Sequence, residues 1–178
     1  MILSKSIVGG ALATLCMDVG GALGRATGLI AGTPKPILGK WFTYLLQGRL
    51  IHADIVASPE VPLRMPVVTA IHYGIGIVLA GCFTALCSWQ PPDREEQFPL
   101  AASFGVFTVL LAWFLMFPAM GWGIAGTRGP AQLLLTRSTL VYHAFYGLGL
   151  GLWTAVLAPL LMRSSRGTRR RSRARSAR

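Results

Sequence analysis

The stretch LAASFGVFTVLLAWFLMF, from Leu100 to Phe117, decides the fold of this chain. It carries no charged residue, and its only hydroxyl side chains are those of Ser103 and Thr108. A helix of about 20 apolar residues can cross the hydrocarbon core of a bilayer, because all its backbone polar groups are satisfied internally. This stretch therefore predicts a transmembrane helix within a longer segment, from about 98 to 124.

Three further apolar segments are long enough to span a membrane, at about 7–30, 66–89 and 138–162. The composition agrees: 53% of the 178 residues are hydrophobic and only 13% are charged. A soluble core of this size cannot bury so much apolar surface. We therefore expect an all-α polytopic membrane helix bundle of about four transmembrane helices, forming one domain over residues 1–162.

The first segment has a competing interpretation as a cleaved signal peptide, because Ala11-Leu12-Ala13 resembles a cleavage site after Lys5. The apolar stretch before that site is short for a signal sequence, and the apolar character continues well past it. We therefore expect a retained helix.

The long connection between the first two segments contains a short amphipathic pattern at about 37–47. Leu38, Trp41, Phe42 and Leu45 follow the i, i+3, i+4, i+7 spacing, while Lys40, Thr43 and Gln47 share the other face. The pattern predicts a helix that ends near Gly48. It either lies flat at the membrane surface or packs as a cap on the bundle.

The net charge of +11 is concentrated at the C-terminal end, where eight of the 17 basic residues are arginines of residues 163–178. This tail has no apolar residue larger than alanine, so we expect it to be disordered. Its expected partners are anionic lipid headgroups, because it directly follows a membrane helix. No aromatic-rich surface accompanies it, which argues against nucleic acid.

The distribution of basic residues predicts the orientation in the cell inner (cytoplasmic) membrane. Four spans put both termini on one side, with Lys5, Arg94 and the eight tail arginines, ten in all. The other side carries six: Lys35, Lys40, Arg49, Arg64, Arg128 and Arg137. The count favours cytoplasmic termini. Without the tail it reverses, to two against six.

Five ionisable residues form a candidate intramembrane polar cluster: Asp18, Arg25, His52, His72 and His143. Helix parity places Arg25, His72 and His143 in the half of the membrane that faces the long loop. His52 lies in that loop, and Asp18 is deeper, near mid-span. Ionisable residues within spans are costly and usually face the bundle interior. The cluster is either a proton relay, an ion site or a substrate site, or a structural polar clasp between helices, and we favour the clasp.

Neither a metal nor a cofactor is predicted. Imidazole and carboxylate groups suit zinc, iron or manganese, but no two histidines lie within helical reach of each other. Met116 and Met120, around Pro118, fit packing better than a copper(I) site, and Pro118 predicts a kink. The three cysteines are expected to be small buried hydrophobic residues: Cys16, Cys82 and Cys87.

Glycines recur every four residues along the first and fourth segments, which predicts smooth ridges for close helix packing. The ridges consist of Gly20, Gly24, Gly28 and Gly32, and of Gly147 and Gly151. We expect packing within the bundle, with a homo-oligomer as the alternative use.

Four stretches, in order along the chain, resemble a bacterial family of small four-helix inner-membrane proteins known only as a domain of unknown function. They are GALATLCMD (Gly10–Asp18), LGKWFTYLLQGRLIHADI (Leu38–Ile55), IHYGIG (Ile71–Gly76) and LMFPAMGWGIAGTRGP (Leu115–Pro130). The resemblance covers roughly residues 5–160 and implies about four spans, with no functional residue to carry over. This chain departs from the family pattern at Phe117, where a glutamine is frequent, and in its Arg-rich tail.

No phosphate-binding loop, GxSxG elbow or HExxH motif is present. We therefore expect a non-enzymatic membrane protein, transport-related, a sensor or an accessory subunit. Two alternatives remain open. One is a membrane-embedded enzyme that uses the His/Asp cluster, with or without a metal, on a lipid or small hydrophobic substrate. The other is a structural or assembly factor.

Overall fold

The computed structural model describes residues 2–30, 35–62, 65–130 and 132–161, and every regular element among them is helical. Four helices have the length and apolar composition to cross a membrane, so the chain is a multi-pass membrane protein. Helices α1 (Ile2–Ala26) and α3 (Met65–Trp89) are the first two of them. The fourth joins α7 (Gln132–Leu152) to the π-helical turn η3 (Trp153–Leu157) and continues to Leu161.

The third span is a composite helix over Gln97–Ala119. It consists of α4 (Gln97–Phe107), α5 (Val109–Leu111), the π-helical turn η1 (Ala112–Met116) and α6 (Phe117–Ala119). In the π turn, the backbone N–H of Phe117 donates to the carbonyl oxygen of Ala112. Pro118 comes next and has no N–H to donate. The wider turn lets the helix continue past the position where the sequence predicts a kink.

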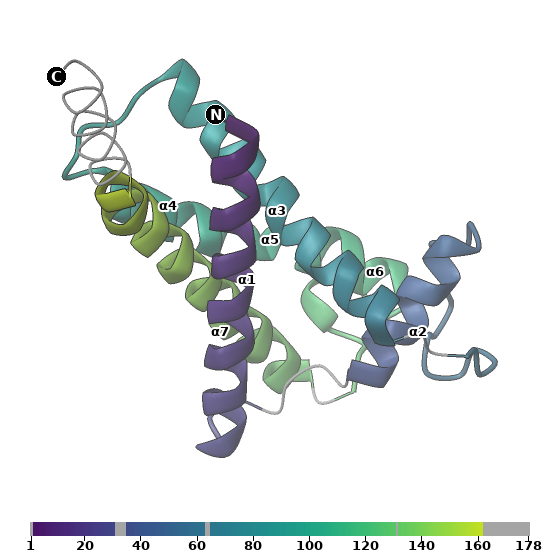
Figure 1. Cartoon of the computed structure of the whole chain (residues 1–178). Helices are drawn as coiled ribbons and strands as arrows, with labels where there is room; N and C mark the ends of the chain where they lie inside the picture. Colours follow the sequence, from purple (N-terminus) through teal and green to yellow (C-terminus); the bar gives the residue numbers. More distant parts are fainter. Residues whose placement is uncertain (1, 31–34, 63–64, 131, 162–178) are drawn as a thin grey trace, which may run out of the picture.

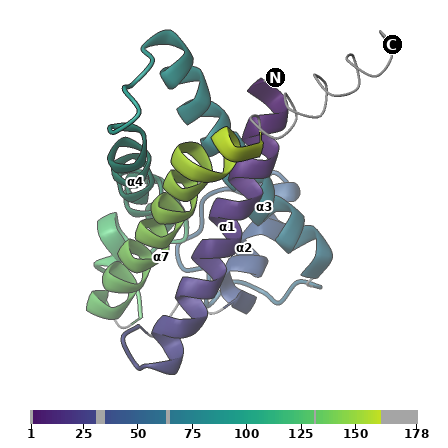
Figure 2. The same ribbon diagram turned by 60° about the vertical axis from the view of Figure 1, so that its left-hand side comes forward.

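The bundle is organised around α1. Helices α3 and α7 pack on either side of α1, and α4 packs against α7 (Figures 1 and 2). An apolar cluster fills the end of the bundle nearer the N-terminus, where the ring centroids of Phe83 and Phe104 lie 5.2 Å apart. Tyr146 belongs to this cluster, and its hydroxyl donates a hydrogen bond of 2.6 Å to the carbonyl oxygen of Gly76.

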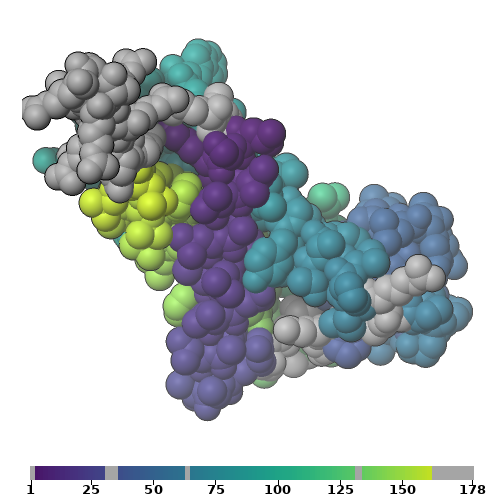
Figure 3. Space-filling view, viewed as in Figure 1, coloured from purple at the N-terminus to yellow at the C-terminus, as the bar shows by residue number. Residues whose placement is uncertain are grey.

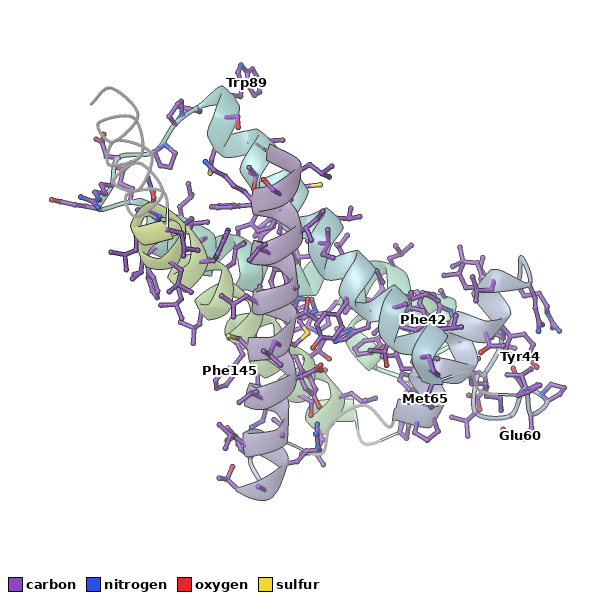
Figure 4. All side chains as sticks on the ribbon, viewed as in Figure 1. Phe42, Tyr44, Glu60, Met65, Trp89 and Phe145 are labelled. Atoms are coloured by element: carbon purple, nitrogen blue, oxygen red, sulfur yellow. The ribbon has the colours of Figure 1, made fainter. Side chains whose placement is uncertain are left out.

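Helix α2 (Lys35–Leu46) and the loop after it form a second packing unit, beside the first turns of α3 (Figure 4). Trp41 Nε1 donates to the carbonyl oxygen of Leu50 at 3.0 Å, and Tyr44 Oη donates to that of Pro59 at 2.8 Å. The aromatic face of α2 is buried, as the capping interpretation predicts. Gly48, with φ +79°, follows the helix where the sequence places its end.

Lys40 lies on the opposite face of α2, yet it is only 5% exposed. The loop folds over it, and its ammonium group contacts the carbonyl oxygen of Ser58 at 2.5 Å and Oε1 of Glu60 at 3.0 Å. The loop therefore covers a face that the amphipathic pattern assigns to solvent.

The chain reverses tightly after the third span, at Gly121. Its φ is +85°, and a Cβ there would lie 2.1 Å from the carbonyl oxygen of Ala53. The loop after α2 is joined to this turn by backbone hydrogen bonds from His52 to Ala119 and from Ile55 to Met120. Only glycine combines this backbone conformation with so close an approach.

The helix crossings use glycines, though not along the ridge expected on α1. A Cβ on Gly20 would overlap the ring of Phe145 of α7, labelled in Figure 4. Gly24, however, faces only Ile30, and Gly28 lies beyond the end of α1 with φ +71° and open space around it. The expected ridge is therefore wrong at Gly28, because the chain has already left the helix. Gly32 and the Arg-rich tail lie outside the described residues.

The closest crossings involve glycines on three helix pairs. A Cβ on Gly10 of α1 would approach Ile77 Cα of α3 to 2.5 Å, and one on Gly149 of α7 would approach Ala13 Cα of α1 to 2.8 Å. A Cβ on Gly105 of α4 would lie 2.1 Å from the Cα of Gly147 on α7. Gly147 and Gly151 both face α4, so the expected ridge of the fourth span packs within the chain.

We expect Gly105→Ala to reduce the free energy of unfolding by about 1–3 kcal/mol, because the new methyl group forces apart two helix backbones. The matched control is Gly74→Ala on α3, where a Cβ meets nothing within 4 Å. It should be neutral or slightly stabilising. Equilibrium unfolding in mixed micelles, followed by circular dichroism, measures both. Equal stability of the two variants would contradict the close α4–α7 crossing.

Candidate functional site

Asp18 of α1 is paired with two residues of α3 in the middle of the bundle. Its Oδ1 lies 3.3 Å from Nε2 of His72, which makes an ion pair when the imidazole is protonated. The hydroxyl of Tyr73 donates to Oδ2 of the same carboxylate at 3.3 Å. Both carboxylate oxygens therefore have polar partners from a neighbouring helix. This arrangement reduces the cost of placing a charge within a membrane span.

The pair is only partly enclosed. The side chains of His72 and Asp18 are 28% and 39% exposed. The reason is the course of the helices, because α1 and α3 are close near the N-terminus of α1 and separate toward its other end (Figures 1 and 3). The helices of the chain therefore do not enclose the Asp18–His72 pair completely.

His143 of α7 is close enough to His72 for the two imidazoles to interact electrostatically. Its Nδ1 is 2.8 Å from Oγ1 of Thr108, and that hydroxyl also lies 2.6 Å from the carbonyl oxygen of Gly105. If the hydroxyl donates to Gly105, it accepts from His143, and the imidazole is then protonated at Nδ1. The third and fourth spans are thereby joined at the level of the Asp18–His72 pair.

These five residues, Asp18, His72, Tyr73, Thr108 and His143, form what we call the polar layer. They come from all four spans, with two of them on α3. Four of the five side chains carry a group that gives up or takes up protons, the exception being the Thr108 hydroxyl. The layer therefore gathers polar and titratable side chains from all four spans.

Arg25 lies seven residues, or about two helical turns, beyond Asp18 on α1, and its side chain contacts a residue of another helix. Its guanidinium donates to the hydroxyl of Tyr142 on α7. The ring of the same tyrosine lies against Gly21, where a Cβ would clash with it. Arg25 therefore joins the first and fourth spans near the end of α1, and its side chain is exposed there.

His52 is separate from the other four candidates. It is 6% exposed, its ring centroid lies 4.8 Å from that of Tyr44, and neither ring nitrogen has a partner among the described residues. Burial lowers the pKa of His52, and the nearby cations Arg49 and Lys40 lower it further. The sequence predicts that all three histidines lie close together, and this is wrong for His52. The loop after α2 places the His52 ring against Tyr44 of that helix.

Sequence reasoning named Asp18, His72 and His143 but missed the side chains that complete the layer. Both could have been suspected from the sequence. Tyr73 directly follows His72, and Thr108 is one of two hydroxyl residues in the most apolar stretch. Tyr142, the partner of Arg25, precedes His143 in the same way. No group of three or more His, Cys, Asp or Glu side chains with the spacing of a metal site occurs among the described residues.

The model of a family described as "Protein of unknown function (DUF2938)" matches residues 7–158, which is most of the chain. No curated protein matches, and no solved structure matches. The matched region includes the entire polar layer.

Proposed function

The chain belongs to this family of proteins of unknown function, and we propose that it is a non-enzymatic, transport-related membrane protein whose polar layer binds and passes on protons. The observation that carries the proposal is the contact between Asp18 and His72, two titratable side chains from different spans. An ionisable residue within a membrane span is rare unless it serves a pathway or a partner. Here it has a partner that is itself a proton carrier.

The surroundings of the pair favour proton exchange over a purely structural clasp. A polar contact that only holds helices together is strongest when both side chains are fully enclosed. The side chains of Asp18 and His72 are instead partly exposed. Protons from the long-loop side can therefore reach the carboxylate and the imidazole. His143, with its hydrogen-bonded Thr108, supplies a second imidazole further into the bundle.

We propose that protons enter the polar layer from the long-loop side. Beyond the polar layer, the apolar cluster with Tyr146 fills the bundle. Two spans carry a π-helical turn, η1 in the third and η3 in the fourth. Such turns are frequent at functional sites. Rearrangement of η3, which begins three residues after the cluster residue Leu150, is the step that would open this apolar half.

Proton movement is measurable with the purified full chain in liposomes that contain a pH-sensitive dye. Under a potassium diffusion potential, negative inside, the wild-type protein should acidify the lumen faster than protein-free liposomes do. Asp18→Asn and His72→Gln should each reduce the rate to the protein-free level, because each removes one proton carrier. The matched control is Asp93→Asn, in the exposed turn between the second and third spans, which should retain the wild-type rate.

Two outcomes would contradict proton transfer by the polar layer. One is a wild-type rate equal to that of protein-free liposomes. The other is full activity of Asp18→Asn and His72→Gln when circular dichroism confirms that all variants are folded.

We further propose that the chain lies in the cell inner membrane with both termini in the cytoplasm, where the Arg-rich tail binds anionic lipid headgroups. The support is the excess of basic residues on the terminal side, which rests on the tail. A C-terminal fusion to a reporter that is active only in the cytoplasm should be active. Activity of a periplasm-specific reporter at the same position would contradict this orientation.

A further inference from the structure

A groove of about 310 Å³ lies between α2 and the first turns of α3, and none of the polar-layer side chains lines it. Phe42 and Leu46 of α2 form one wall, and Val67 and Ile71 of α3 form the other. This volume is at the lower end of the ~300–1,000 Å³ that small-molecule pockets have. The walls are apolar, so water is a poor occupant.

The groove combines apolar walls with a polar edge. Thr43 of α2 and Gln47, in the turn directly after α2, also line it. The Thr43 hydroxyl donates to the carbonyl oxygen of Gly39 at 2.9 Å and can still accept, while the exposed Gln47 amide can donate. Arg49, in the turn that follows, holds its guanidinium 5.1 Å from the Tyr44 ring centroid. A ligand with an apolar chain and a polar or anionic end therefore matches the groove, with its chain against the apolar walls and its polar end at the polar edge.

The position of the groove identifies the source of such a molecule. One wall is the beginning of a membrane-spanning helix, where the bilayer is the immediate surroundings. Large apolar side chains around the groove are exposed: Leu45, Leu46, Met65 and Val67 are 37%, 64%, 44% and 37% exposed, respectively. In a membrane protein such a surface contacts lipid.

We propose that this groove binds one acyl chain of a membrane phospholipid, with the ester and headgroup region at the edge formed by Thr43 and Gln47. The bound chain fills the space between α2 and α3 and so holds the α2 unit against the bundle. This site is independent of the proposed proton transfer, because none of its lining residues belongs to the polar layer.

Two variants on the same helix test the site. Val67→Trp fills the groove, whereas Val78→Trp places the same side chain on the exposed face of α3, where the valine is 64% exposed and lines no groove. The full chain is extracted from membranes, washed with detergent and analysed by native mass spectrometry. Wild type and Val78→Trp should retain one phospholipid per chain. Val67→Trp should retain it about tenfold less, which corresponds to about 1.4 kcal/mol.

A second measurement does not depend on any variant folding. The wild-type chain is reconstituted in vesicles of phosphatidylethanolamine and phosphatidylglycerol, with a trace of phosphatidylcholine that carries a diazirine in its acyl chain. After illumination, the label should be enriched on peptides of residues 42–47 and 67–71 over the exposed face of α3 around Val78, which lies outside this groove. Equal lipid retention by the two tryptophan variants, or labelling no stronger at the groove than at Val78, would overturn the proposal.

Discussion

A carboxylate within the apolar helix α1 is the constraint on which the rest of this structure depends. In a bilayer, a charged side chain near the middle of a span is unfavourable by a few kcal/mol on insertion scales. Asp18 is too short to reach the membrane surface, so its partners have to come from neighbouring helices. His72 and Tyr73 of α3 supply them. The position of α3 against α1 is therefore determined by polar contacts as well as by packing.

The polar layer requires helices that approach one another closely, and glycines make this possible. Gly10 lets α1 and α3 approach closely two turns before Asp18, and Gly149 and Gly105 bring α7 against α1 and α4. Without these crossings, Thr108 on the third span would not reach His143 on the fourth. Close packing and polar contacts thus act together, since lipid offers no hydrophobic driving force between helices.

The sequence predicts the architecture well, because the length and apolar character of each span follow directly from the physics of the bilayer. It also identifies Asp18, His72 and His143 as costly residues that need partners. It could not predict which partners they find, since the rotation of each helix about its axis depends on glycine crossings in three dimensions. His52 illustrates the limit: the sequence places it in the long loop but does not show that its ring packs against Tyr44. Lys40 likewise looked solvent-exposed because the pattern of α2 alone says nothing of the loop that covers it.

The most direct test of the account is the energetic coupling between Asp18 and His72, measured by a double-mutant cycle in mixed micelles. The free energies of unfolding of wild type, Asp18→Asn, His72→Gln and the double variant give the coupling. For a partly exposed pair we expect about 1 kcal/mol, the upper end of exposed ion pairs and below the values of fully buried ones. If the two single effects add to within about 0.3 kcal/mol, the contact between Asp18 and His72 does not organise the bundle, and the account is contradicted.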